Sequence, residues 1–170
     1  MSRRVSENVV VQKTGAPMLG LDAVRVRSAM AADRMQLMRL IDAYFDFYRT
    51  PFPAARIEAL LDTLQNDDRL GIQLVAADGD RLIGFASLYA CIDTLVAGRI
   101  LVMNDLFVSH EARRGGIGAA LLAAARDYAQ KAGYLRLDWV TAADNLDAQR
   151  FYERQGALRG DWVSYSVPIG

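Results

Sequence analysis

A glycine-rich turn between a strand pattern and a helix pattern constrains this 170-residue chain most strongly. Residues 99–108 are mostly apolar and predict a strand, and residues 113–118 then read Arg-Arg-Gly-Gly-Ile-Gly. Glycines leave backbone N–H groups uncovered, and the positive end of a following helix attracts anions. The two arginines add positive charge. The pattern predicts a site for a phosphorylated ligand, and an ordinary turn at a helix start is the simpler interpretation.

Two familiar phosphate-binding motifs do not fit this turn. A P-loop ends in Gly-Lys-Ser/Thr, and no lysine follows Gly118. A dinucleotide fingerprint reads Gly-x-Gly-x-x-Gly, whereas the order here is Arg-x-x-Gly-x-Gly at Arg113, Gly116 and Gly118. The preceding strand also comes late in the chain. The residue order therefore indicates a different phosphate-bearing ligand.

The Arg-x-x-Gly-x-Gly order resembles the acetyl-CoA motif of the GNAT superfamily of N-acetyltransferases, Gln/Arg-x-x-Gly-x-Gly/Ala. Residues 145–152 read Asn-Leu-Asp-Ala-Gln-Arg-Phe-Tyr and are followed by Gly156-Ala157, which is similar to the family's Asn-x-x-Ala-x-x-Phe-Tyr segment. One predicted helix and one predicted strand separate the two motifs, as in the family. The resemblance covers residues 24–167. Residues 46–53 are similar to a histone or polyamine (diamine) acetyltransferase subgroup.

Composition limits the class of protein further. Hydrophobic residues make up 52% of the chain, which is enough for a core, and the net charge of zero favours neither nucleic acid nor an anionic membrane. No apolar run approaches the roughly 20 residues of a membrane helix. The single cysteine, Cys91, excludes an internal disulfide and is predicted to lie in the core, and the single histidine, His110, is predicted at the surface. We expect no metal site and, because no signal peptide pattern is present, a cytoplasmic protein.

Hydrophobic periodicity predicts a flexible tail over residues 1–22 and one domain over residues 23–170. The predicted order is a strand, two helices, three antiparallel strands, a helix, a strand, a helix, and a final strand or strand pair. This order predicts an α/β (α+β) fold with a mixed, mostly antiparallel sheet and helices on both faces, and it is also the order of the GNAT fold. The predicted elements are 24–27, 35–48, 54–65, 71–77, 82–91, 99–109, 116–133, 135–140, 145–155 and 157–167.

The resemblance implies where acetyl-CoA, the co-substrate of the family, would bind. The strand that ends at residue 108 would splay from the parallel strand 135–140, so that its free backbone groups pair with the pantetheine arm. The pyrophosphate would rest on the glycine-rich turn. Asn145 has a local role as a helix N-cap as well, and the two roles are compatible. The implied cofactor-binding residues are Leu106, Phe107, Val108, Arg113, Arg114, Gly115, Gly116, Ile117, Gly118, Ala119, Asn145, Ala148 and Tyr152.

The resemblance also implies catalytic residues. Acyl transfer from a thioester expels a thiolate, and the phenol of Tyr152 can protonate it; a half-buried core tyrosine is the alternative. An alkylammonium acceptor has a pKa near 10 and must lose a proton before it attacks. Polyamine-type members have a Glu-Asp pair here, whereas this chain has Asn104 and Asp105, and an asparagine cannot act as a base. Asp105 is the candidate that is left, although strand neighbours face opposite sides.

The first predicted helix supplies candidates for the acceptor site. Asp42 and Asp46 lie four residues apart, with Tyr48 close by, and acidic groups there would attract a cationic amine. We predict Asp42, Asp46, Tyr48 and Asn104 as substrate-binding residues; a solvated helix face with an Asp46–Arg49 pair is the alternative.

Three functions are compatible with these motifs. The first is acetylation of a small primary amine, the second is acetylation of a protein lysine or N-terminus, and the third is CoA binding without catalysis. Final strands of the family often pair between subunits, so we expect a homodimer in which Trp162 and Tyr165 supply apolar contacts. We expect neither a nucleic-acid nor a membrane partner.

Overall fold

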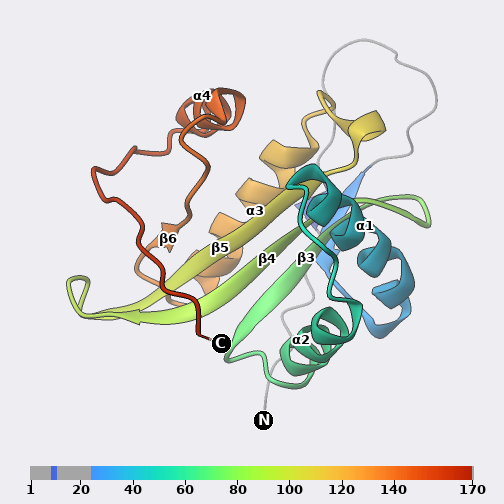
Figure 1. Cartoon of the computed structure of the whole chain (residues 1–170), viewed down its shortest axis with the longest axis horizontal. Helices are drawn as coiled ribbons and strands as arrows, with labels where there is room; N and C mark the ends of the chain where they lie inside the picture. Colours follow the sequence, from blue (N-terminus) through green and yellow to red (C-terminus); the bar gives the residue numbers. More distant parts are fainter. Residues whose placement is uncertain (1–8, 11–23, 170) are drawn as a thin grey trace. The chain divides into compact units, whose positions relative to one another are not determined.

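The computed structural model describes residues 9–10 and 24–169, and the chain divides into two compact units, Met1–Trp139 and Val140–Gly170. Figure 1 shows the helices and strands of the chain. The first unit contains β1 (Val9–Val10), β2 (Arg25–Ser28), α1 (Arg34–Phe47), α2 (Ala54–Asn66), β3 (Gly71–Asp78), β4 (Arg81–Asp93), β5 (Gly98–Val108), α3 (Ile117–Lys131) and β6 (Leu137–Asp138). Two short 3-10 helices, Ala31–Asp33 and His110–Ala112, precede α1 and α3. The second unit contains α4 (Leu146–Arg154).

The sheet of the first unit has its strands in sequence order, from β1 to β6. Neighbouring strands are antiparallel except for β5 and β6, which are parallel. The turn between β3 and β4 is as tight as predicted, because Asp78 pairs with Arg81 and Gly79 adopts a positive φ of 58°. The predicted mixed, mostly antiparallel sheet is therefore confirmed.

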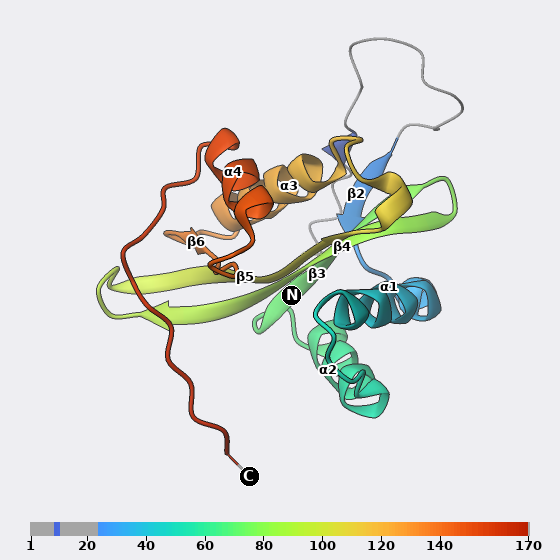
Figure 2. The same ribbon diagram turned by 45° about the horizontal axis from the view of Figure 1, so that its top comes forward.

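Helices cover both faces of the sheet, as predicted: α1 and α2 lie on one face and α3 on the other (Figure 2). Successive strand residues point to opposite faces, so Phe85 faces α1 and α2 while Gly84 faces α3. A Cβ at Gly84 would lie 2.8 Å from the Phe107 carbonyl oxygen and 3.3 Å from Leu121, which explains the glycine. The core on the first face consists of Leu37, Leu40, Ile41, Leu61, Val75, Ala77, Leu82, Phe85 and Phe107.

Two details of the sequence prediction are corrected, and one is confirmed. Strand β6 spans only Leu137–Asp138, because its ladder with β5 ends at the pair formed by Val102 and Asp138. Cys91 is exposed, since β3 pairs with β4 only as far as Tyr89 and the rest of β4 has β5 as its one neighbour among the described strands. His110 is exposed, as predicted.

The final strand predicted over residues 157–167 is also wrong. Residues 157–169 form no strand, and the second unit offers no other strand with which they could pair. Large apolar side chains stand exposed there, among them Trp162 and Tyr165 at 88% and 90%.

The predicted tail over residues 1–22 lies outside the described residues apart from Val9–Val10, which pair with β2. No helix in the described ranges has the length and apolar character needed to span a membrane.

Candidate active site

One edge of β5 has no partner strand among the described residues beyond its short ladder with β6. The two strands pair at Leu101 and Val102, and β5 then continues to Val108 with β4 as its one partner among the described strands. Peptide groups along this edge can pair with an extended ligand in the manner of an added strand. This stretch of β5 includes Leu106, Phe107 and Val108, which the resemblance implies as partners of the pantetheine arm.

The glycine-rich turn leads into α3, whose first amides have no acceptor within the helix. Gly116 is the N-cap with a φ of 81°, and no side chain caps the helix. The first intrahelical bond is donated by the Ala120 N–H to the Gly116 carbonyl (3.0 Å), so the amides of Ile117–Ala119 lack an acceptor within the helix. A Cβ at Gly116 would meet no atom within 4 Å. The turn thus combines free donors, open space and the positive helix end, which fits an anion.

Arg113 connects this turn to β5 and α1. Its Nε donates to the Val108 carbonyl oxygen (3.1 Å), and its guanidinium lies 5.5 Å and 5.8 Å from the ring centres of Phe47 and Phe107. The positive charge of Arg113 therefore lies on aromatic rings at the end of β5. Arg114 is exposed and adopts a positive φ of 61°.

A β-bulge places Asn104 and Asp105 on the same face of the sheet. Ser87 pairs with Asp105 and the next residue, Leu88, pairs with Met103, so Asn104 is the extra residue of β5. The Asn104 Nδ2 donates to Asp105 Oδ1 at 3.1 Å. The expectation that these two neighbours face opposite sides is therefore wrong, because the bulge interrupts the alternation.

The register also builds a polar row next to an apolar one. Gln73, Ser87 and Asp105 are direct cross-strand neighbours on β3, β4 and β5, on the face that α1 covers. Gln73 and Ser87 are buried and exchange hydrogen bonds of 3.1 Å and 3.2 Å. Sequence reasoning gave these two residues no role. The available signal was a polar residue in the interior of each of two mostly apolar strands. The parallel apolar row consists of Val75, Phe85 and Phe107.

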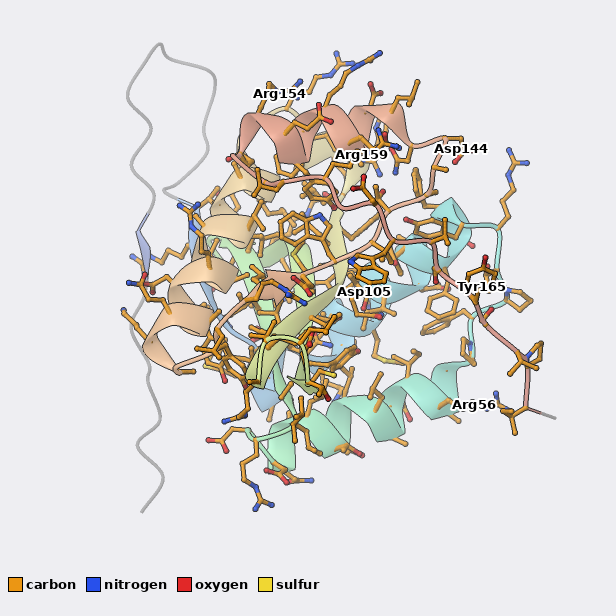
Figure 3. All side chains as sticks on the ribbon, turned by 90° about the vertical axis from the view of Figure 1, so that its left-hand side faces the viewer. Arg56, Asp105, Asp144, Arg154, Arg159 and Tyr165 are labelled. Carbon is orange, nitrogen blue, oxygen red and sulfur yellow. The ribbon has the colours of Figure 1, made fainter. Side chains whose placement is uncertain are left out.

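Two tyrosines face Asp105. Burial, and then the charge and hydrogen bonding of Asp105, raise the pKa of the Tyr44 phenol well above its ordinary value. Burial, together with the charge of Asp105, raises the pKa of Tyr89 to about 12. The Tyr44 ring lies 5.0 Å from that of Tyr48, and a hollow of about 220 Å³ is lined by Tyr44, Phe45, Tyr48 and Thr50. Figure 3 shows Asp105 on the side of β5 that faces α1.

Asp42 and Asp46 lie apart from this group. Both are exposed, and each is two residues from Tyr44, which places it about 200° around the helix from that ring. The structure thus brings Tyr48 and Asn104 to the face of Asp105 but directs Asp42 and Asp46 to solvent.

The second unit carries the downstream motif on α4. The Asn145 side chain accepts a hydrogen bond from the Ala148 N–H (3.2 Å), which confirms its N-cap role. Phe151 and Tyr152 are half-buried, with ring centres 5.2 Å apart. Gly156, with a φ of 79°, ends the helix.

The sequence of this chain matches the model of the acetyltransferase (GNAT) family over residues 37–157. The chain therefore belongs to the GNAT family, whose members use acetyl-CoA as co-substrate, and it is an N-acetyltransferase.

Relatives and solved structures agree with this membership. The uncharacterized N-acetyltransferase YhfO of Bacillus subtilis (strain 168) is 34% identical over 134 residues, which cover 78% of this chain and 89% of YhfO. The L-ornithine N5-acetyltransferase NATA1 of Arabidopsis thaliana is 32% identical over 74 residues, which cover 44% of this chain and 32% of NATA1. A crystal structure of a probable acetyltransferase superposes with a TM-score of 0.75 at 29% identity and covers 86% of this chain and 98% of that one.

Proposed function

We propose that this N-acetyltransferase acetylates a small cationic primary amine. The observation that carries the proposal is Asp105, a half-buried carboxylate beside aromatic side chains and on the same strand as the open β5 edge. NATA1, which is similar over part of its length, is named for a reaction at the side-chain amine of ornithine. Residues 46–53 are similar to the histone or polyamine subgroup, and we propose that the chain is a member of that subgroup.

The donor site that we propose uses the two motifs. In the first unit, the β5 edge at Leu106–Val108 would hold the pantetheine arm, and the amides of residues 114–119, with Arg113 and Arg114, would hold the pyrophosphate. The uncapped helix start and the open space at Gly116 fit such a phosphate group. In the second unit, we assign Asn145, Ala148 and Tyr152 to the same ligand on the basis of the motif.

Two side chains supply the proton transfers of the proposed reaction. Acetyl-CoA brings an acetyl group activated as a thioester, and coenzyme A is released as a thiol. Asp105 accepts the proton that the ammonium must lose, directly or through water, so that the nitrogen can form its bond to the acetyl carbon. The nitrogen loses a second proton to solvent as the amide forms, and Asp105 then returns its own proton to solvent. Tyr152 donates a proton to the sulfur as the carbon–sulfur bond breaks, and it regains one from solvent.

The release of free thiol tests the proposal. The protein is mixed with acetyl-CoA and a panel that contains alkylamines, diamines, amino acids, a lysine peptide and peptides with free N-termini. We expect turnover with small amines that carry a positive charge. Turnover confined to peptides would replace the small-amine proposal with the protein-acceptor alternative. Tight CoA binding without turnover of any amine would indicate a CoA-binding module.

We also propose a homodimer. The segment 157–169 exposes several large apolar side chains, including Trp162 and Tyr165, and exposed apolar clusters of this kind mark interaction surfaces.

A further inference from the structure

We propose that Asp105, with the rings of Tyr44 and Tyr89 beside it, forms a cation site for the ammonium group of the acceptor, and that this site rejects amines with a carboxylate next to the ammonium. The inference rests on the proposed function, because it assumes an amine acceptor. It adds the residues that recognise the ammonium group of the acceptor, and it states which amines are excluded.

The first support is the missing counter-ion of Asp105. Within the described part of the chain, none of the ion pairs includes Asp105, whereas Asp33 pairs with Arg27, Asp93 with Arg136, and other acids pair in the same way. Its hydrogen-bond donor among the described residues is neutral, the amide of Asn104 at 3.1 Å. A half-buried carboxylate held by a neutral group attracts a cation, because burial weakens its hydration.

Arg113 does not supply that charge. Its guanidinium lies over Phe47 and Phe107 and its Nε donates to the Val108 carbonyl, so it is engaged away from the carboxylate. The charge of Asp105 is therefore left for a ligand.

The second support is the aromatic surroundings. Tyr89 lies on the same face as Ser87, the cross-strand partner of Asp105, and Tyr44 packs on Phe107, which is two residues from Asp105 on that face. Tyr44 is fixed by edge-to-face contacts with Phe85 and Phe107, at 6.0 Å and 5.9 Å between ring centres. Fixed aromatic rings around a carboxylate are a suitable surrounding for an alkylammonium, since the ring faces attract cations.

The third support is the hollow beside Tyr44. Its lining consists of Tyr44, Phe45, Tyr48 and Thr50, and it contains no basic side chain. An apolar stem fits this lining, and a carboxylate next to the ammonium would meet the like charge of Asp105. The preferred acceptor is thus an amine on an alkyl stem, with any acidic group several carbons away.

Binding of three matched probes tests the site without turnover. Pentylamine, pentanol and norleucine share the alkyl stem; pentanol replaces the ammonium with a neutral group, and norleucine adds a carboxylate beside it. We expect calorimetric titration, in the presence of CoA, to show pentylamine binding at least about tenfold more tightly than either other probe.

Four variants assign that preference to residues. Asp105→Asn should reduce the preference for pentylamine over pentanol to about threefold or less and leave pentanol binding unchanged. Asp80→Asn removes the same charge in the exposed turn between β3 and β4 and should keep the preference. An unchanged preference in Asp105→Asn, or its loss in Asp46→Asn instead, would overturn the inference.

Tyr44→Leu retains apolar volume without an aromatic face and should weaken the binding of pentylamine alone by about three- to tenfold. Equal weakening of pentylamine and pentanol in that variant would contradict the role of the ring.

These measurements separate the inference from the proposed function. Charge-dependent binding at Asp105 without acetyl transfer to any amine would refute only the proposed function. Acetyl transfer to amines, together with a preference for pentylamine over pentanol that Asp105→Asn leaves unchanged, would refute only the cation site. Circular dichroism melts show whether each variant is folded, and Tyr89→Leu provides a further variant at the same site should Asp105→Asn fail to fold.

Discussion

At the scale of single residues, Tyr152 carries the clearest catalytic prediction. It is a half-buried tyrosine near the end of α4, and Tyr152→Phe removes the hydroxyl but keeps the ring contact with Phe151. We expect kcat to fall by about a hundredfold or more, in the range of general acid–base catalysis, while the Kd for CoA changes little. Steady-state kinetics and a CoA titration measure the two effects. An unaltered kcat would remove Tyr152 from the mechanism.

Asp33 carries a residue-scale prediction about stability and pH. It is buried, receives two bonds from Arg27 (2.5 Å and 2.9 Å) and one from the Met30 N–H (2.7 Å). The hydrogen bonds from Arg27 lower the pKa of Asp33. A carboxyl whose pKa is lower in the folded state stabilises the fold above its unfolded value of about 3.9, and this stabilisation is lost as the pH falls through the lowered value.

Asp33→Asn should therefore lower the free energy of unfolding at pH 7 by about 2 kcal/mol. This is less than the ~3–5 kcal/mol for breaking a fully buried pair, because Arg27 is partly exposed. Urea unfolding at pH 7 and pH 3 measures the change, and the deficit should be smaller at pH 3. A deficit that is equal at both pH values would show that the charge of Asp33 is not its cause.

At the scale of secondary-structure elements, the start of α3 is the part of the donor site that can be altered most cleanly. Gly116 has a φ of 81° and open space around its Cα, so Gly116→Ala adds left-handed strain of about 1–2 kcal/mol without a clash. Gly116→Asp adds a negative charge as well. We expect Gly116→Asp to weaken CoA binding at least about tenfold more than Gly116→Ala, as measured by titration. Equal Kd values for the two variants would argue against a phosphate at this helix start.

The bulge in β5 makes a prediction about deletion. Deleting Asn104 makes Met103 and Asp105 consecutive opposite Leu88 and Ser87, which restores a regular ladder and leaves both side chains on their present faces. We expect this deletion variant to fold with a Tm within about 5 °C of wild type and with reduced activity, because Asp105 loses a donor. Deleting Leu106 instead would shift the strand by one residue, so that the side chains on one side of the deletion point to the opposite faces of the sheet. We expect no cooperative thermal unfolding for that variant. Similar melts for both deletions would contradict the register.

The elements themselves could be predicted from the sequence because their signals are local. The period of Leu37, Ile41 and Tyr44 marks α1, and the tight turn at Gly79 marks the hairpin. The face of Asp105 could not be predicted, since a bulge is a property of two paired strands. The same holds for Cys91, whose exposure depends on how far β3 accompanies β4.

The residues of the candidate site also differ in how far the sequence alone predicts them. The two donor motifs are each short and contiguous, so the sequence alone predicts them, whereas the acceptor side depends on side chains brought together by the register. Tyr89 and Ser87 meet Asp105 only once β4 and β5 pair. Asp42 and Asp46 looked suitable by spacing, but spacing does not show which side of a helix faces the core.

At the scale of the whole molecule, the apolar segment 157–169 is notable because its large side chains are not buried by their own unit. Leu158, Trp162, Tyr165, Val167 and Ile169 are each at least 77% exposed. A water-exposed row of this kind is unfavourable for an isolated chain, and burial against a second copy would remove each aromatic ring's roughly 150–250 Å² from water. The proposed dimer accounts for these side chains.

The last prediction tests that dimer. Sedimentation velocity should find wild-type protein at twice the 18.8 kDa mass of one chain, and Trp162→Ser combined with Tyr165→Ser should raise the dissociation constant by about a hundredfold or more, because buried aromatic anchors dominate such interfaces. Ser164→Ala alters the residue next to Tyr165 without removing apolar area and should leave the dimer intact. A wild-type monomer at millimolar concentration, or a dimer unaffected by the double substitution, would show that these side chains do not join two copies.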